Sequence, residues 1–169
     1  MGSGRQLIVM RHAKAGELPG GPDFERALRP RGRRDSAAAG QWLAEEGFRP
    51  DAVICSAARR TRQTWQYVAA ALGGEPQFRT DRRLYEADSE DVAGIIRHTP
   101  DSVRTLMYIG HNPAAAGLVG QLTGSEPEFP TAAIAVVALP AGPWSELSPG
   151  DGEIVGSWRP RPAAAGPEG

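Results

Sequence analysis

The sequence predicts an α/β domain, a three-layer α/β/α sandwich built around a mostly parallel central sheet. Short apolar segments recur at residues 6–10, 51–55 and 105–110, and each has the composition of a strand that is buried on both faces. Segments with apolar residues at helical spacing lie between them. Strands that alternate with helices are typical of a parallel sheet covered on both sides by helices.

In the first half of the chain, each expected helix follows an expected strand. Residues 16–32 are rich in glycine, proline and charge, and we expect a long loop there. A helix is expected over about residues 33–46, with Gly47 as its stop, and a second over residues 59–72. These two helices follow the first and second strands, as a parallel sheet requires.

The second half continues the pattern with one weaker extended segment at residues 77–84. Ser89 is expected to cap the next helix, and Asn112 to cap a further one, with Pro113 at its first helical position. Two late strands complete the sheet, at residues 133–139 and 153–158. We therefore expect a single domain over residues 1–158, with a flexible leader at residues 1–5 and a disordered tail at residues 159–169.

Composition excludes several classes of function. The chain has 19 basic and 20 acidic residues in 169, which argues against nucleic-acid binding driven by bulk charge. Cys55 is the only cysteine, so no internal disulfide can form, and it lies in an apolar strand as an inert thiol. No apolar run is long enough to span a membrane. We expect a cytoplasmic protein, and a monomer in preference to an oligomer.

Polar and basic residues follow three of the predicted strands. The first strand ends in Arg11 and His12, the second in Ser56 with Arg60 shortly after it, and the third leads into His111. Ligands of open α/β sheets bind at the carboxyl ends of the strands. The sequence therefore predicts a site at one sheet edge that holds two histidines and two arginines.

This set of residues favours a phosphoryl group as the ligand. Guanidinium groups form paired hydrogen bonds with phosphate oxygens, and the helix N-terminus beyond His111 adds a positive dipole end. One neutral imidazole can attack phosphorus, while the other stabilises the charge on the equatorial oxygens. Lys14 either adds to the attraction for phosphate or is a solvated loop lysine.

A metal or nucleotide cofactor is not expected. The two arginines would repel a cation beside the histidines, and no Cys-x-x-Cys or His-x-x-x-His spacing is present. The chain also lacks the G-x-x-x-x-G-K-[ST] sequence of a nucleotide-binding P-loop.

Four segments resemble motifs of the histidine phosphatase superfamily, also called phosphoglycerate mutase-like. "RHAKAG" resembles its RHG signature, with Ala13 in place of glycine as in the SixA-like branch. "SAARRTRQT" resembles SxxxRAxQT, "IGHNP" resembles GHNP, and "DFERALRPRG" resembles DxxRxLtxxG. The resemblance covers about residues 7–139, with the motifs in the family's order.

The resemblance implies a phosphoglycerate mutase-like fold and a metal-independent phosphatase. It implies that His12 is the nucleophile that forms a phosphohistidine intermediate, and that Arg11, Arg60 and His111 hold the phosphoryl oxygens. The short chain, without large insertions, is similar to SixA-like phosphohistidine phosphatases, whose open site suits a phosphorylated protein.

Glu86 is the first candidate for a general acid, since "LYEAD" resembles the segment in which family members often carry a glutamate. Asp88 and Asp23 are the alternatives. If Glu86 faces the phosphate, ester substrates become more plausible, and if it does not, phosphohistidine is favoured, because an imidazole leaving group needs less help from an acid.

Two other functions remain open from the sequence. The first is a small-metabolite phosphomonoesterase or mutase of the same superfamily. The second, of a different class, is a phospholigand-binding module that has lost catalysis. The expected partner is accordingly a phosphorylated protein or a small phosphorylated metabolite, with no nucleic acid and no membrane.

Overall fold

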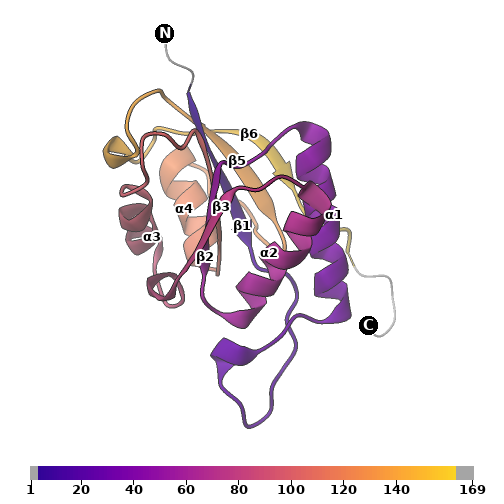
Figure 1. Ribbon diagram of the computed structural model, residues 1–169. Helices are drawn as coiled ribbons and strands as arrows, with labels where there is room; N and C mark the ends of the chain where they lie inside the picture. Colours follow the sequence, from indigo (N-terminus) through magenta and orange to yellow (C-terminus); the bar gives the residue numbers. More distant parts are fainter. Residues whose placement is uncertain (1–3, 163–169) are drawn as a thin grey trace.

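The computed structural model describes residues 4–162, which form a six-stranded sheet between two pairs of helices (Figure 1). In chain order, the strands are β1 (Arg5–Arg11), β2 (Ala52–Ser56), β3 (Gln77–Asp81), β4 (Thr105–Gly110), β5 (Ile134–Leu139) and β6 (Glu153–Trp158). The helices are α1 (Pro30–Glu46), α2 (Arg59–Leu72), α3 (Ser89–Ile96) and α4 (Ala114–Thr123).

The sheet has the strand order β3-β2-β4-β1-β5-β6. The pairs β3–β2, β2–β4 and β4–β1 are parallel, whereas β5 runs antiparallel to both β1 and β6. The α/β fold with a mostly parallel sheet, predicted from the alternation of strands and helices, is confirmed.

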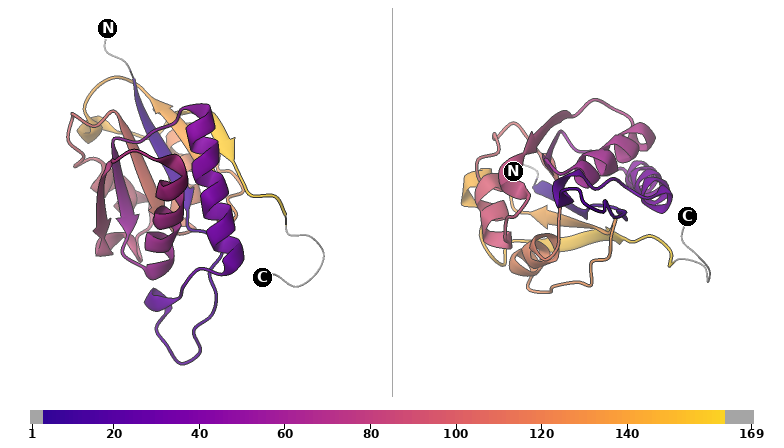
Figure 2. Two further views of the ribbon diagram at one scale, coloured as in Figure 1. Left: turned by 45° about the vertical axis from the view of Figure 1, so that its right-hand side comes forward. Right: turned by 90° about the horizontal axis from the view of Figure 1, so that it is seen from below.

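Alternate residues of the central strands enter two separate cores. Leu7 and Val9 of β1 face the core under α3 and α4, while Ile8 and Met10 face the core under α1 and α2. Figure 2 shows the two helix pairs on opposite sides of the sheet. Both faces of β1 are therefore buried, which explains why its sequence is apolar without alternation.

Three helix starts differ from the sequence-based expectation. Helix α1 begins three residues early, because Pro30 suits a first helical position. Helix α3 is capped by Asp88, not Ser89, through a reciprocal capping box with Asp91. In α4 the capping position is held by Pro113, although the Asn112 side chain still accepts the N–H of Ala116.

Arg5, which we expected in the flexible leader, belongs instead to β1 and pairs with Leu139. Residues 1–3, and residues 163–169 of the expected tail, lie outside the described residues. Within residues 4–162, no helix combines the length and the apolar character needed to cross a membrane.

The carboxyl ends of β1, β2 and β4 lie at one edge of the sheet, at the bottom of Figure 1. Arg11 stands opposite Gly110 in the β1–β4 register, and Cys55 stands opposite Ile109 in the β2–β4 register. The loop between β1 and α1 extends beyond this edge and includes the short 3₁₀ turn η1 (Asp23–Glu25). The strand ends and this loop define where a ligand could bind.

Candidate active site

His12 is fixed by its backbone at the junction of three strands. Its N–H donates to the carbonyl of Gly110 at 2.9 Å, and its carbonyl accepts from Ala132 at 3.0 Å. The ring nitrogen Nδ1 lies 2.8 Å from the carbonyl oxygen of Ala13, which can only accept a hydrogen bond. Nδ1 therefore carries the proton, and the neutral ring keeps its lone pair on Nε2.

His111 lies beside His12, with the two ring centroids 5.3 Å apart. Its Nε2 lies 2.8 Å from the hydroxyl of Ser56, and its Nδ1 lies 3.5 Å from Nη2 of Arg60. Because a guanidinium only donates, Nδ1 is the acceptor and Nε2 donates to Ser56. Ser56 also accepts the N–H of Ala58, so its hydroxyl both orders the turn before α2 and orients the His111 ring.

Both predicted arginines are held at the same sheet edge. Arg60, in the first turn of α2, is 6% exposed and donates through Nη1 and Nη2 to Asp23. Arg11 ends β1, and its Nη1 donates to the carbonyl of Phe129 at 3.2 Å. Within residues 4–162, the Nε atoms of both arginines are buried without a hydrogen-bond partner. Two buried cationic donors are thus available to an anion.

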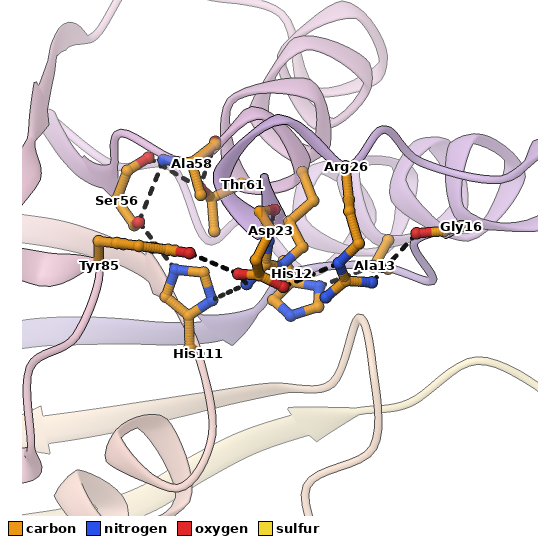
Figure 3. A network of polar contacts seen from close by, with 11 residues as sticks. His12, Ala13, Gly16, Asp23, Arg26, Ser56, Ala58, Thr61, Tyr85 and His111 are labelled. Atoms are coloured by element: carbon orange, nitrogen blue, oxygen red, sulfur yellow. Dashed lines mark hydrogen bonds and ion pairs between the residues drawn. The ribbon is translucent and has the colours of Figure 1, made fainter. Parts of the chain in front are cut away.

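The loop after β1 brings the carboxylate of Asp23 to Arg60 (Figure 3). Together they belong to one hydrogen-bonded polar cluster, which consists of Asp23, Arg26, Ser56, Arg60, Tyr85 and His111. The carboxylate accepts from Arg60 at 3.0 Å, from Arg26 at 2.8 Å and from the hydroxyl of Tyr85 at 2.5 Å. The Tyr85 hydrogen bond, followed by those of the two arginines, holds the pKa of Asp23 well below its usual range. The same contact with the carboxylate raises the pKa of Tyr85.

Glu86 and Lys14 do not join this hydrogen-bonded cluster. Glu86 is exposed, and no hydrogen bond or ion pair between described residues links it to the histidines or arginines. Lys14 is half-buried, and its backbone carbonyl accepts the N–H of Arg29, but its ammonium group makes no such link either within residues 4–162. Asp88, an alternative acid, caps α3.

Tyr85 is the site residue that the sequence did not indicate. It follows the 3₁₀ turn η2 (Arg82–Leu84), where Leu84 enters the core. The ring of Tyr85 meets that of His111 edge-on, with centroids 5.7 Å apart. The next residue, Glu86, faces solvent. A one-residue difference in this turn therefore decides which side chain reaches the site.

Burial determines the protonation state of both histidines. Desolvation, reinforced by the neighbouring His111, Arg60 and Arg11, lowers the pKa of His12 to about 3. Desolvation and the charge of Arg60 lower the pKa of His111 to about 4. Both rings are neutral at physiological pH, which is the form that a nitrogen nucleophile requires.

These shifts predict that acid destabilises the fold. The pKa of each ring is lower in the folded chain than the ordinary 6.5, so the unfolded chain binds more protons below pH 6.5. The free energy of unfolding should therefore fall as the pH drops through 6.5 towards about 4. Urea denaturation at about pH 7 and about pH 5, in buffer without oxyanions, measures this change.

The matched comparison is the double variant His12→Asn, His111→Asn, which keeps all carboxylates but removes both buried rings. Its urea midpoint should depend less on pH than that of the wild type. Equal pH dependence in the two proteins would contradict the assignment of this effect to the histidines.

No group of three or more His, Cys, Asp or Glu side chains that could hold a metal ion occurs within residues 4–162. Cys55 is fully buried, and burial raises the pKa of its thiol to about 12, so it stays a neutral thiol.

Solved structures of similar proteins share this architecture. A protein from Nakamurella multipartita that carries the name SixA superposes with a TM-score of 0.82 and 30% identity, covering 94% of this chain and 98% of that one. The protein histidine phosphatase SixA, solved in complex with tungstate, superposes with a TM-score of 0.77 and 27% identity over 90% of this chain and 95% of that one.

Sequence comparison leads to the same group of proteins. An uncharacterized protein of Mycobacterium tuberculosis is 37% identical over 163 residues, which cover 90% of this chain and 100% of that protein. A family model described as histidine phosphatase superfamily (branch 1) matches residues 7–114. The chain therefore belongs to the histidine phosphatase superfamily and is a phosphatase.

Proposed function

We propose that this phosphatase removes the phosphoryl group from phosphohistidine on a protein, through a phosphohistidine intermediate at His12. One observation carries the choice of substrate: the polar cluster contains no carboxylic acid poised to donate a proton. Its carboxylate, Asp23, is held ionised by Tyr85 and two arginines, and Glu86 is exposed outside the cluster.

The geometry of His12 supports its role as the nucleophile. Nε2 has its lone pair free because Nδ1 donates to the carbonyl of Ala13. In the first step, Nε2 forms a bond to phosphorus while the bond to the leaving group breaks and its electron pair departs with that group. In the second step, water attacks phosphorus, the N–P bond breaks, and inorganic phosphate leaves with the neutral ring restored.

The cations beside His12 support its pairing with a phosphoryl dianion. The unpaired Nε–H groups of Arg11 and Arg60 would gain acceptors in the phosphoryl oxygens. His111, whose ring centroid is 5.3 Å from that of His12, would donate to the same oxygens once its Nε2–H turns from Ser56 to the ligand. This arrangement would stabilise the charge that spreads over the equatorial oxygens in the transition state.

The leaving group decides which substrates such a site can process. An alkoxide must be protonated as it departs, and a well-placed acid contributes about 10²–10⁴-fold to that step. The imidazole of phosphohistidine can take its proton from solvent on the nitrogen remote from phosphorus and leave as a neutral ring. A site without a poised acid therefore favours phosphohistidine. The SixA named as a protein histidine phosphatase among the similar structures agrees with this choice.

A series of substrates with different leaving groups tests the proposal. We expect rapid phosphate release from a phosphohistidine peptide and from p-nitrophenyl phosphate, whose leaving groups need little protonation. The value of kcat/KM should be lower by at least about 10²-fold for a simple alkyl phosphate, because no acid assists that substrate. Steady-state phosphate-release assays give the comparison.

The matched control is Glu86→Gln, which should leave all of these rates unchanged. Fast alkyl phosphate turnover that falls in Glu86→Gln would instead identify an ester phosphatase with Glu86 as its acid. Tight phosphopeptide binding without any phosphate release would identify a binding module.

A further inference from the structure

The guanidinium of Arg60 has a terminal edge formed by Nη1 and Nη2 and a lateral edge formed by Nε and Nη2. The two edges have different partners. On the terminal edge, Nη1 donates to the backbone carbonyl of Asp23 at 2.9 Å, and Nη2 donates to the Asp23 carboxylate at 3.0 Å. On the lateral edge, Nε has no partner among the described residues, and Nη2 lies 3.5 Å from Nδ1 of His111. Because Nη2 also donates to Nδ1 of His111, the lateral Nε–H is the donor left for a ligand beside His111.

Asp23 is itself fixed from two directions. Arg26, three residues along the same loop, donates to one carboxylate oxygen at 2.8 Å. Tyr85, from a distant part of the chain, donates its hydroxyl to the other oxygen (Figure 3). The ring of Tyr85 packs edge-on against Phe24, with centroids 4.9 Å apart. The carboxylate therefore has little freedom to swing away from Arg60.

We propose that Asp23, held by Tyr85, is a positioning residue that turns the lateral edge of Arg60 toward the phosphoryl group. This inference rests on the proposed function, because it requires a phosphoryl group beside His12 and His111. A guanidinium delivers two parallel hydrogen bonds only when its plane and edge are correctly oriented. Occupation of the terminal edge by Asp23 selects that orientation before the substrate arrives, which reduces the ordering that binding requires.

The opposite role for Asp23 predicts the opposite change in oxyanion affinity when its carboxylate is removed. If its carboxylate stood in for a substrate oxygen, it would compete with the phosphoryl group for Arg60, and its removal would tighten oxyanion binding. The structure favours positioning, because Asp23 binds the terminal edge and leaves the lateral Nε–H unpaired. The backbone carbonyl of Asp23, which carries no net charge, shares in holding the guanidinium.

Inhibition by vanadate, a phosphoryl mimic, provides the test in the full-length protein. Asp23→Ala should raise the Ki for vanadate by about 10-fold, because one charge-assisted hydrogen bond to Arg60 is lost. Tyr85→Phe, which keeps the ring but removes the hydroxyl, should raise Ki by about 3-fold, and Asp23→Asn should lie between the two. KM for p-nitrophenyl phosphate should rise in the same order.

A double-mutant cycle separates positioning from a general effect on the fold. In an Arg60→Ala background, Asp23→Ala should have almost no further effect on Ki, because the group that it orients is absent. Glu90→Ala is the matched control: it removes an exposed carboxylate–arginine pair on α3, with Arg97, and should leave Ki unchanged. Thermal unfolding of each variant confirms that folded protein is compared.

Three results would overturn the inference: an unchanged Ki in Asp23→Ala and Tyr85→Phe, a lower Ki in Asp23→Ala, or the same effect of Asp23→Ala with and without Arg60. If one of these results is found while the wild type still releases phosphate from a phosphohistidine peptide, the proposed function stands and only the positioning role fails. A wild type that neither releases phosphate nor binds vanadate would overturn both.

Discussion

Replacing His12 with alanine should lower kcat for both p-nitrophenyl phosphate and a phosphohistidine peptide by about 10⁴-fold or more. The substitution removes the nitrogen that is proposed to bond to phosphorus, and the lone pair of the neighbouring His111 Nδ1 is already directed at Nη2 of Arg60. Vanadate or phosphate should still bind, because both guanidinium groups remain. Single-turnover assays, together with a search for an alkali-stable phosphoenzyme, measure the loss.

The control is His98→Ala, which removes an exposed histidine just beyond α3 and should leave kcat unchanged. Wild-type turnover in His12→Ala would exclude His12 as the nucleophile. Loss of vanadate binding as well as turnover would show instead that the variant has lost the site as a whole.

The second large effect is expected for Arg60→Ala, which should lower kcat/KM by about 10²–10³-fold. This variant loses the lateral donors proposed for the phosphoryl oxygens. Arg60→Lys should recover only part of the loss, since an ammonium cannot serve two partners through two planar edges.

Arg59→Ala is the matched control, because Arg59 is the adjacent residue of α2 and is exposed. In Arg59→Ala, kcat/KM for p-nitrophenyl phosphate and the Ki for phosphate as product inhibitor should change little. Equal losses in the two variants would mean that the basic charge of α2, and not the specific place of Arg60, assists the reaction.

The strand ends were the most predictable part of the molecule. An apolar segment such as "TLMYIG" signals a strand that is buried on both faces, and parallel strands necessarily place their carboxyl ends together. Because of that topology, the proximity of His12 and His111 follows from the sequence without any knowledge of side-chain contacts. The observed register of Arg11 against Gly110 shows the alignment directly.

The side of the site formed by Asp23 and Tyr85 could not be derived in this way. These residues are 62 positions apart, and they meet because an irregular loop and a short 3₁₀ turn fold toward one another. Neither segment has a periodic pattern that specifies which side chain faces inward. The motif containing Leu84 and Glu86 drew attention to the glutamate, whereas the turn directs Tyr85 toward His111.

The exact first residue of a helix is likewise difficult to predict from sequence. Ser89 and Asp88 are both good capping residues, and composition alone does not decide between neighbours. Asp88 takes the position because Asp91 lies three residues later and can return the hydrogen bond to its backbone.

The two sides of the site differ in which contacts must be lost before their backbone amides can exchange with solvent. The backbone of His12 is hydrogen-bonded to Gly110 and Ala132, so this side can separate only when the central sheet itself comes apart. Asp23 belongs to a surface loop whose contacts with Tyr85 can be lost while the sheet stays intact. Amide hydrogen exchange would thus occur by global unfolding around His12 and by local opening around Asp23. The backbone of the proposed nucleophile is thus protected by the stability of the whole sheet, whereas the Asp23 side of the site depends on contacts between two surface segments.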